Sequence, residues 1–207
     1  KNDYDIKVFE STINGNPHDF AQKIISENPQ VVSFSCYIWN ITKTLEVARL
    51  IRQNCDCKIV LGGPEVAYRA KDVLQKYEFI DFVLSGEGEW TFPDFLDNIN
   101  GELSLVSGLT YRRNGEIITV PEKEYTETPP SPFSDEFFES LNGRIAYIET
   151  ARGCPYRCAF CLSGRCSPLR FFDLERVKGD ILKLANSGTQ TVNFVDRTFN
   201  ANTNRAN

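Results

Sequence analysis

The sequence contains no methionine, a single histidine and no long apolar run. No stretch approaches the ~20 apolar residues that a membrane-spanning helix needs, and no basic-then-apolar leader opens the chain. These absences predict a cytoplasmic protein without a membrane partner. Because the chain opens with Lys1 and lacks methionine altogether, we expect a fragment of a larger protein, or a sequence from which residues were removed or recorded differently.

Composition and charge indicate a folded chain with two differently charged parts. The 207 residues are 41% hydrophobic and 12% aromatic, which is typical of one or two globular domains. Residues 1–143 hold 13 basic and 23 acidic side chains, a net charge of −10, whereas residues 144–207 hold 10 and 5, a net charge of +5. Seven cysteines without a secretory leader favour a reducing compartment. Nothing in this pattern supports nucleic-acid binding.

Three cysteines stand close together in a pattern that predicts a metal site. Cys154, Cys158 and Cys161 form C-x3-C-x2-C, with Phe160 immediately before the last cysteine. Three thiolates can hold three irons of a four-iron, four-sulfur (4Fe-4S) cluster and leave the fourth iron open. A structural zinc site needs four protein ligands, so zinc is a weaker interpretation of this motif than an iron–sulfur cluster. Cys166 has no place in the motif, and its role stays open between a buried thiol, a solvent-side thiol, and a ligand or acid.

This motif resembles that of the radical S-adenosylmethionine (SAM) enzymes. The resemblance implies that Cys154, Cys158 and Cys161 are cluster ligands and that Phe160 lies close to the adenine of SAM. It also implies a mechanism in which the reduced cluster passes one electron to the sulfonium and releases a 5′-deoxyadenosyl radical. Such an enzyme needs an electron donor such as flavodoxin or ferredoxin.

The first half of the chain alternates strand and helix patterns. Short β-branched or aromatic runs occupy Tyr4 to Glu10, Gln30 to Cys36, Lys58 to Leu61 and Ile80 to Leu84. Helices are expected between these runs, beginning near Pro17, Ile41 and Pro64. The alternation predicts an α/β fold with a doubly wound, flavodoxin/Rossmann-like parallel sheet. Ligands of such sheets bind beyond the carboxyl ends of the strands.

The loops at those strand ends are Ser33 to Trp39, Leu61 to Glu65 and Ser85 to Glu89. Together they resemble the cobalamin-binding domain that precedes the barrel in one class of radical SAM proteins. The resemblance spans roughly residues 1 to 100, and it implies contacts around the corrin ring or its nucleotide tail. The residues concerned are Ser33, Ser35, Gly62, Gly63, Gly86, Glu87 and Gly88. Glycine after a strand often only makes a turn, so that alternative stays open.

Two departures from the cobalamin-binding pattern are visible. The Asp-x-His-x-x-Gly motif that supplies a lower cobalt ligand is absent, and we expect His18 to be a surface residue at a helix start. The lower axial ligand is therefore not assigned. The first strand and helix of the family are also expected to be missing, which would remove part of the core of this domain.

The second half is expected to pass from a hairpin through a linker into a new domain. Ser104 to Arg112 and Glu116 to Val120 flank Asn114-Gly115, a strong hairpin signal. We expect domain boundaries of 1–120 for the cobalamin-binding-like domain with its hairpin, 121–140 for a proline-rich linker, and 141–207 for the truncated start of a TIM-type (β/α)6 radical SAM barrel.

Within that third segment, two strands and a helix are expected. Arg144 to Thr150 predicts the first strand, Asp173 to Ser187 a capped helix, and Gln190 to Asp196 the second strand. Asp196 at the end of the second strand either faces an active site or caps a turn. A full barrel needs about six β/α units of roughly 30 residues each, so we expect the fragment alone to be inactive.

Three functional interpretations follow. The preferred one is a cobalamin-dependent radical SAM enzyme, a methyltransferase acting on an unactivated carbon being one form, with a small-molecule or unknown substrate. The second is a methylthiotransferase with another cluster at Cys36, Cys55 and Cys57, although these cysteines are expected at opposite ends of the sheet. The third is a non-catalytic corrinoid-binding or zinc-stabilised module. The sequence does not distinguish methyl transfer from other radical chemistry.

Overall fold

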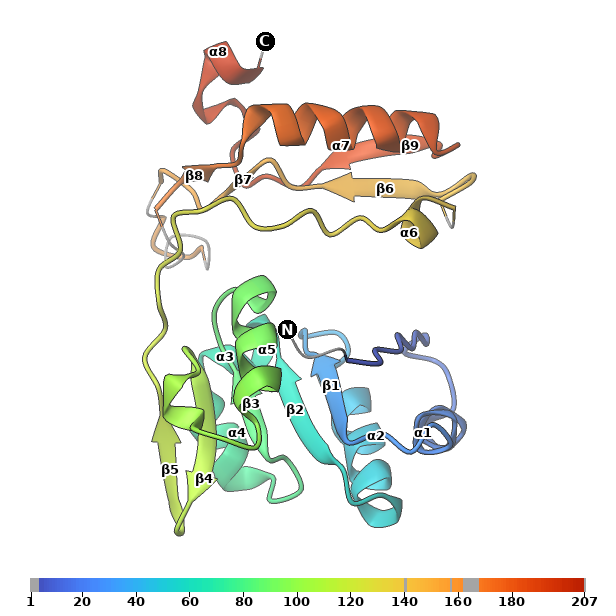
Figure 1. Cartoon of the computed structure of the whole chain (residues 1–207), viewed down its shortest axis with the longest axis vertical. Helices are drawn as coiled ribbons and strands as arrows, with labels where there is room; N and C mark the ends of the chain where they lie inside the picture. The colour runs from blue at the N-terminus through green and yellow to red at the C-terminus, as the bar shows by residue number, and fades with distance from the viewer. Residues whose placement is uncertain (1–3, 140, 157, 162–167, 207) are drawn as a thin grey trace. The chain divides into compact units, whose positions relative to one another are not determined.

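The computed structural model describes residues 4–139, 141–156, 158–161 and 168–206. The chain forms two compact units, residues 1–123 and 124–207 (Figure 1). The sequence predicts a separate linker at 121–140, whereas the chain from Glu124 onward belongs to the second unit.

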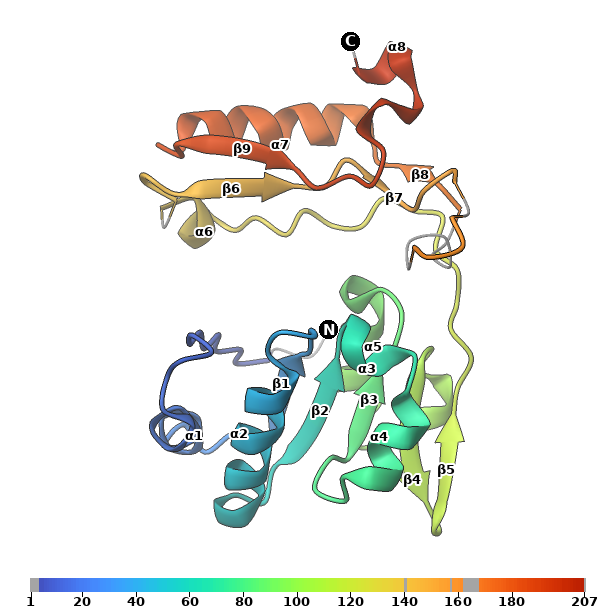
Figure 2. The same cartoon turned by 180° about the vertical axis from the view of Figure 1, so that it is seen from behind.

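The first unit is built on a mixed five-stranded sheet (Figures 1 and 2). Its strands, in spatial order, are β1 (Val31–Ser35), β2 (Lys58–Gly62), β3 (Phe82–Leu84), β4 (Leu109–Arg113) and β5 (Glu116–Thr119). The first three strands are parallel, and β4 and β5 continue the sheet as an antiparallel hairpin. The predicted α/β Rossmann-like class is confirmed, with the qualification that the hairpin makes the sheet mixed.

Helices cover both faces of this sheet. They are α1 (Pro17–Ile25), α2 (Ile41–Asn54), α3 (Pro64–Ala67), α4 (Ala70–Lys76) and α5 (Gly88–Asn98), followed by the short 3-10 helix η1 (Leu103–Leu105). On β2, Ile59 and Leu61 pack with α1 to α4, while Val60 points to the other face and packs with Phe95 of α5. Alternate side chains of a strand point to opposite faces, so this arrangement buries β2 on both sides.

Local signals in the sequence set several element ends. Asn16 caps α1 by accepting a hydrogen bond from the backbone N of His18 at 2.9 Å, and His18 lies exposed in the first helical turn, as predicted. The predicted hairpin is confirmed, with Asn114 and Gly115 at φ values of 53° and 83° between β4 and β5. Positive φ at both turn residues matches the right-handed twist of the flanking strands.

The strand predicted at Tyr4 to Glu10 is wrong. This segment has no regular secondary structure, and Ile6 and Val8 are 64% and 83% exposed. The Tyr4 hydroxyl donates to Asp97 Oδ1 of α5 at 2.7 Å, which anchors one end of the segment. An alternating pattern becomes a strand only when another strand offers its backbone groups, and within the described residues β1 lies at the sheet edge without a partner on that side.

The second unit is organised around a parallel strand pair. Its elements are α6 (Asp135–Glu139), β6 (Ile145–Ile148), β7 (Ala151–Arg152), β8 (Arg170–Phe171), α7 (Leu174–Asn186), β9 (Thr191–Phe194), η3 (Phe199–Ala201) and α8 (Thr203–Ala206). Strands β6 and β9 pair in parallel, and α7 lies between them in the chain. This β-α-β order agrees with the predicted start of a barrel, and Asp173 caps α7 through the Arg176 backbone N at 2.8 Å.

The segment expected as a linker contributes to this second core. Phe133, Phe137 and Phe138 pack against Leu141 and neighbouring buried residues of β6 and α7. Upstream of them, the backbone N of Asp173 donates to the Thr128 hydroxyl at 2.9 Å. The aromatic side chains at the end of this proline-rich segment therefore pack into the second unit.

Candidate functional site

The cysteine loop is held at its base by a short antiparallel ladder in the second unit. β7 and β8 pair through Ala151 with Phe171 and Arg152 with Arg170, which brings the two ends of the loop together. Phe172 follows β8, is 3% exposed, and donates its backbone N to Thr150 O at 3.0 Å. The loop that carries the cysteines therefore starts and ends on a frame made of β7, β8 and the buried Phe172.

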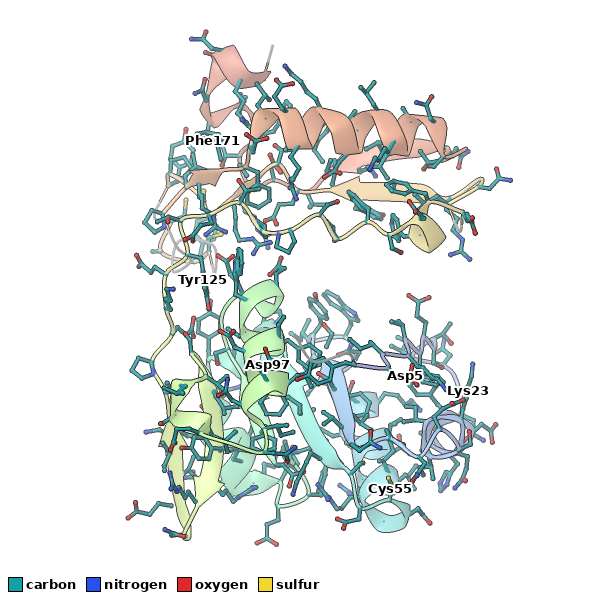
Figure 3. All side chains as sticks on the ribbon, viewed as in Figure 1. Asp5, Lys23, Cys55, Asp97, Tyr125 and Phe171 are labelled. Carbon is teal, nitrogen blue, oxygen red and sulfur yellow. The ribbon has the colours of Figure 1, made fainter. Side chains whose placement is uncertain are left out.

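Cationic side chains surround the buried ring of Phe172. The guanidinium groups of Arg152, Arg170 and Arg176 lie 5.6, 5.8 and 5.2 Å from its centre. Arg152 also pairs with Glu149 at 2.6 Å. Figure 3 shows the neighbouring Phe171, whose ring lies 5.3 Å from the Arg205 guanidinium. Stacked and paired arginines of this kind stabilise the frame and give it positive charge.

The three predicted cluster ligands occupy this one loop but differ in exposure. Cys154 and Cys161 are partly buried, Cys158 is exposed, and the backbone N of Cys161 donates to Cys158 O at 3.1 Å. Phe160 projects outward with 94% of its surface exposed. Cys166 lies outside the described residues.

The donor chemistry of the loop fits an iron–sulfur cluster. All three thiols are free of disulfides, and soft thiolates are the ligands that such clusters take. Within the ranges given above, no three histidine, cysteine or acidic side chains converge on a common metal position. A cluster would therefore draw the three thiolates together as it binds, in the way that metal binding generally couples to local folding.

Asp196 links the ends of strands β6 and β9. Its carboxylate accepts from the backbone N of Thr150 at 2.6 Å and also from the Thr150 hydroxyl, and Val195 N donates to Ile148 O at 3.0 Å. Of the two alternatives left open by the sequence, these contacts favour the turn-stabilising one. The residue that sequence reasoning missed is Thr198, whose hydroxyl lies 3.5 Å from Cys154 Sγ.

In the first unit, the parallel strands end at one edge of the sheet (Figure 1). Ser33 and Ser35 of β1 are exposed, and their register partners on β2 are Val60 and Gly62. The side chain of Asn40 fixes the loop after β1, because it donates to Ser35 O at 2.9 Å and accepts from the Tyr37 backbone N at 2.8 Å.

A cleft of about 1250 Å³ lies beside β1 within the first unit. Ser33, Ser35 and Asn40 line it from the sheet side, and residues 4–13 line it from the N-terminal side. Asp5 and Asp97, labelled in Figure 3, also border it. The predicted serines therefore face a space of ligand size, whereas the predicted glycines lie at the ends of β2 and β3.

The predicted glycines divide into two kinds. Gly63 has a φ of 99°, and an added Cβ would lie 2.6 Å from Cys36 O, so the fold itself requires glycine there. Gly86 also has a positive φ, 85°. A Cβ at Gly62 would meet only Leu84 O at 3.7 Å, and one at Gly88 would meet nothing within 4 Å. The fold therefore does not require glycine at Gly62 or Gly88 for lack of space.

Three cysteines of the first unit behave differently from the loop cysteines. Cys36 and Cys57 are 0% and 1% exposed, and burial raises the pKa of each thiol to about 12. Cys36 lies at the carboxyl end of β1, while Cys55 and Cys57 precede β2 at its other end. Buried neutral thiols at opposite ends of a sheet do not make a shared metal site.

We expect alkylation to separate these two groups of cysteines. In anaerobic, metal-free protein at pH 8, iodoacetamide should modify Cys158 at least tenfold faster than Cys36 or Cys57, since only thiolates react and Cys158 is exposed. Peptide mass spectrometry against time measures the three rates. Guanidinium-unfolded protein is the control, in which all three rates should become similar; equal rates in the folded protein would contradict the described burial.

Three comparisons relate the chain to known proteins. Residues 2–96 match the family model described as the B12 binding domain. The 2-(S-pantetheinyl)-carbapenam-3-carboxylate methyltransferase of Streptantibioticus cattleyicolor is 31% identical over 194 residues, covering 83% of this chain and 28% of that protein. The cobalamin-dependent radical SAM methyltransferase TokK of Streptomyces tokunonensis is 29% identical over 191 residues, with the same coverage.

A solved structure shares the fold. The radical SAM methyltransferase TsrM of Kitasatospora setae, determined with cobalamin and a [4Fe-4S] cluster bound, superposes with a TM-score of 0.72 at 18% identity, over 91% of this chain and 42% of that one. The chain spans less than a third of the two curated relatives. Among the described residues, no helix is long and apolar enough to span a bilayer.

Proposed function

We propose that this chain, a part of a radical SAM protein with an N-terminal B12-binding domain, belongs to a cobalamin-dependent enzyme that reductively cleaves SAM and transfers a methyl group to an unactivated carbon. One observation carries the proposal. The match to the B12-binding family at residues 2–96 and the C-x3-C-x2-C loop after β7 occur on the same chain, in separate compact units.

The cysteine loop would hold the cluster. When bound, a 4Fe-4S cluster with one open iron supplies the electron that cleaves SAM, and cobalamin supplies the carrier for the methyl group. Cys154, Cys158 and Cys161 would each ligate one iron. Phe160 is exposed beside the last ligand, so its ring is free to lie against the adenine.

The strand ends of the first unit would contact the corrinoid. Ser33 and Ser35 present hydroxyl groups to the cleft and would hydrogen-bond the polar periphery or the nucleotide tail. Gly62 and Gly88 would allow the backbone to approach the ligand. Gly63, Gly86 and Glu87 would shape the loops that carry these contacts, with Glu87 preceding the first turn of α5.

We further propose the partners and setting of the complete protein. The substrate would be a small molecule, as the names of the similar methyltransferases indicate for those proteins. The electron would come from a donor such as flavodoxin or ferredoxin. Cysteines that ligate a cluster must stay reduced, which favours the cytoplasm.

The two other interpretations have less support. A methylthiotransferase would need a second cluster, but the buried positions of Cys36 and Cys57 at opposite strand ends do not supply one. A zinc-stabilised module would need a fourth ligand that the three-cysteine motif does not supply. A non-catalytic corrinoid-binding module would leave the C-x3-C-x2-C motif without a role.

Anaerobic reconstitution tests the proposal. The longest available parent chain is incubated with iron, sulfide and hydroxocobalamin, desalted, and examined by metal analysis and visible spectroscopy. We expect about four irons and one corrinoid per chain. Eight irons without corrinoid would favour the methylthiotransferase, corrinoid without iron the non-catalytic module, and zinc without iron the zinc-stabilised one.

A further inference from the structure

A threonine hydroxyl approaches one of the three loop cysteines from a different element. Thr198 Oγ1 lies 3.5 Å from Cys154 Sγ, although the two residues are 44 positions apart in the chain. Thr198 follows β9 and precedes the 3-10 helix η3, whereas Cys154 belongs to the loop after β7. Both side chains are partly buried. The contact therefore joins the cysteine loop to the second barrel strand.

The frame around Thr198 fixes where its hydroxyl lies. Asp196, two residues earlier, binds the backbone of Thr150 at the end of β6, and Ala201 N donates to Thr198 O at 3.2 Å. A β-branched side chain also has few χ1 rotamers. The hydroxyl is thus positioned by the β6–β9 pair and the turn after it, rather than by the cysteine loop.

The chemistry of a cluster ligand would decide the direction of this hydrogen bond. A thiol and a hydroxyl can each donate, and the distance alone does not say which one does. A cysteine that ligates iron is a thiolate without a proton. In the loaded protein only the Thr198 O–H could donate, and Cys154 Sγ would accept.

We propose that Thr198 donates a hydrogen bond to the Cys154 sulfur of the bound cluster and thereby raises the reduction potential of that cluster. This inference rests on the proposed function. Hydrogen bonds to cluster sulfurs are among the factors that set the potentials of iron–sulfur centres. The bond favours the reduced state because reduction adds negative charge to the sulfurs. Thr198 is therefore a positioning residue for the electron-transfer step.

Two substitutions test the hydroxyl separately from the side-chain shape. Thr198→Val keeps the branched shape and removes the donor, whereas Thr198→Ser keeps the donor. Each variant of the longest available parent is reconstituted with iron and sulfide, and the cluster is titrated by EPR at controlled potential. For Thr198→Val we expect the wild-type iron content, but an about tenfold lower ratio of reduced to oxidised cluster at a fixed potential. This corresponds to a negative shift of about 59 mV.

Controls make the outcomes distinguishable. Thr198→Ser should restore the wild-type potential, and Thr203→Val, at the start of the exposed helix α8, should leave it unchanged. An unchanged potential in Thr198→Val would overturn the proposal, as would a shift that Thr198→Ser shares. A wild-type chain that binds no iron would instead overturn the proposed function.

A second measurement covers the case in which Thr198→Val assembles little cluster. Pulsed EPR of the reduced wild-type cluster, in H₂O and in D₂O, detects exchangeable protons close to its sulfurs. We expect one exchangeable proton coupling that Thr198→Ser retains. Its absence from the wild-type spectrum would overturn the proposal without any use of the valine variant.

Discussion

Replacing Cys158 by alanine is expected to lower the iron content of the reconstituted parent protein from about four per chain to near zero, while corrinoid binding stays at the wild-type level. A cluster held by only three thiolates loses a third of its protein ligands with this change. Cys158 is exposed, so its truncation removes little buried surface and should leave the fold intact. Loss of iron would therefore report loss of a ligand.

Iron and sulfide analysis after anaerobic desalting measures this effect. Cys55→Ala is the matched control, because Cys55 is a partly buried cysteine of the first unit and lies outside the loop. The control should keep wild-type iron. Iron retained at full stoichiometry in Cys158→Ala would contradict the assignment of the loop. If Cys55→Ala lost about half of the iron, the methylthiotransferase interpretation would be supported instead.

Features encoded by near neighbours in the sequence could be predicted. The Asn114-Gly115 turn needs positive φ at two adjacent residues, and few residue types accept that. The Asp173 cap satisfies a backbone N–H three residues away. The spacing of Cys154, Cys158 and Cys161 likewise predicts a metal site from a short stretch of sequence. In each case the deciding interaction lies within a few residues, so the pattern alone predicts it.

Features that depend on distant partners could not be predicted in the same way. Tyr4 to Glu10 alternates like a strand, but it pairs with no described strand. The proline content of residues 121–140 is typical of a linker, yet Phe133 and its aromatic neighbours pack against the core of the second unit. Thr198 approaches Cys154 across 44 positions of sequence, from the end of a strand, β9, that pairs in parallel with β6. One available signal was its position just beyond a strand predicted to belong to a barrel, where functional side chains gather.

The predicted glycines show the same division within one set of residues. From sequence, all of them are glycines after strands, and a turn or a ligand explains each equally well. The structure separates them by what a side chain would meet: at Gly63 the backbone of Cys36 excludes any Cβ, while at Gly88 the space is open. Because Gly88 also begins α5, replacing it leaves the sheet untouched. It is thus the position at which ligand contact can be tested without unfolding the domain.

Gly88→Leu is expected to weaken corrinoid binding about tenfold or more, a loss of about 1.4 kcal/mol. The leucine side chain would occupy the space through which, in the proposed site, the backbone approaches the ligand, while leucine itself favours helix over glycine. Gly179→Leu in α7 is the matched control, since its added Cβ also meets nothing within 4 Å and it lies in the other unit. Spectroscopic titration with hydroxocobalamin measures both affinities, and thermal unfolding checks both folds. Both variants should keep wild-type iron. Equal corrinoid affinity in the two variants would show that Gly88 does not contact the corrinoid. It would favour the serine-lined cleft beside β1 as the contact surface.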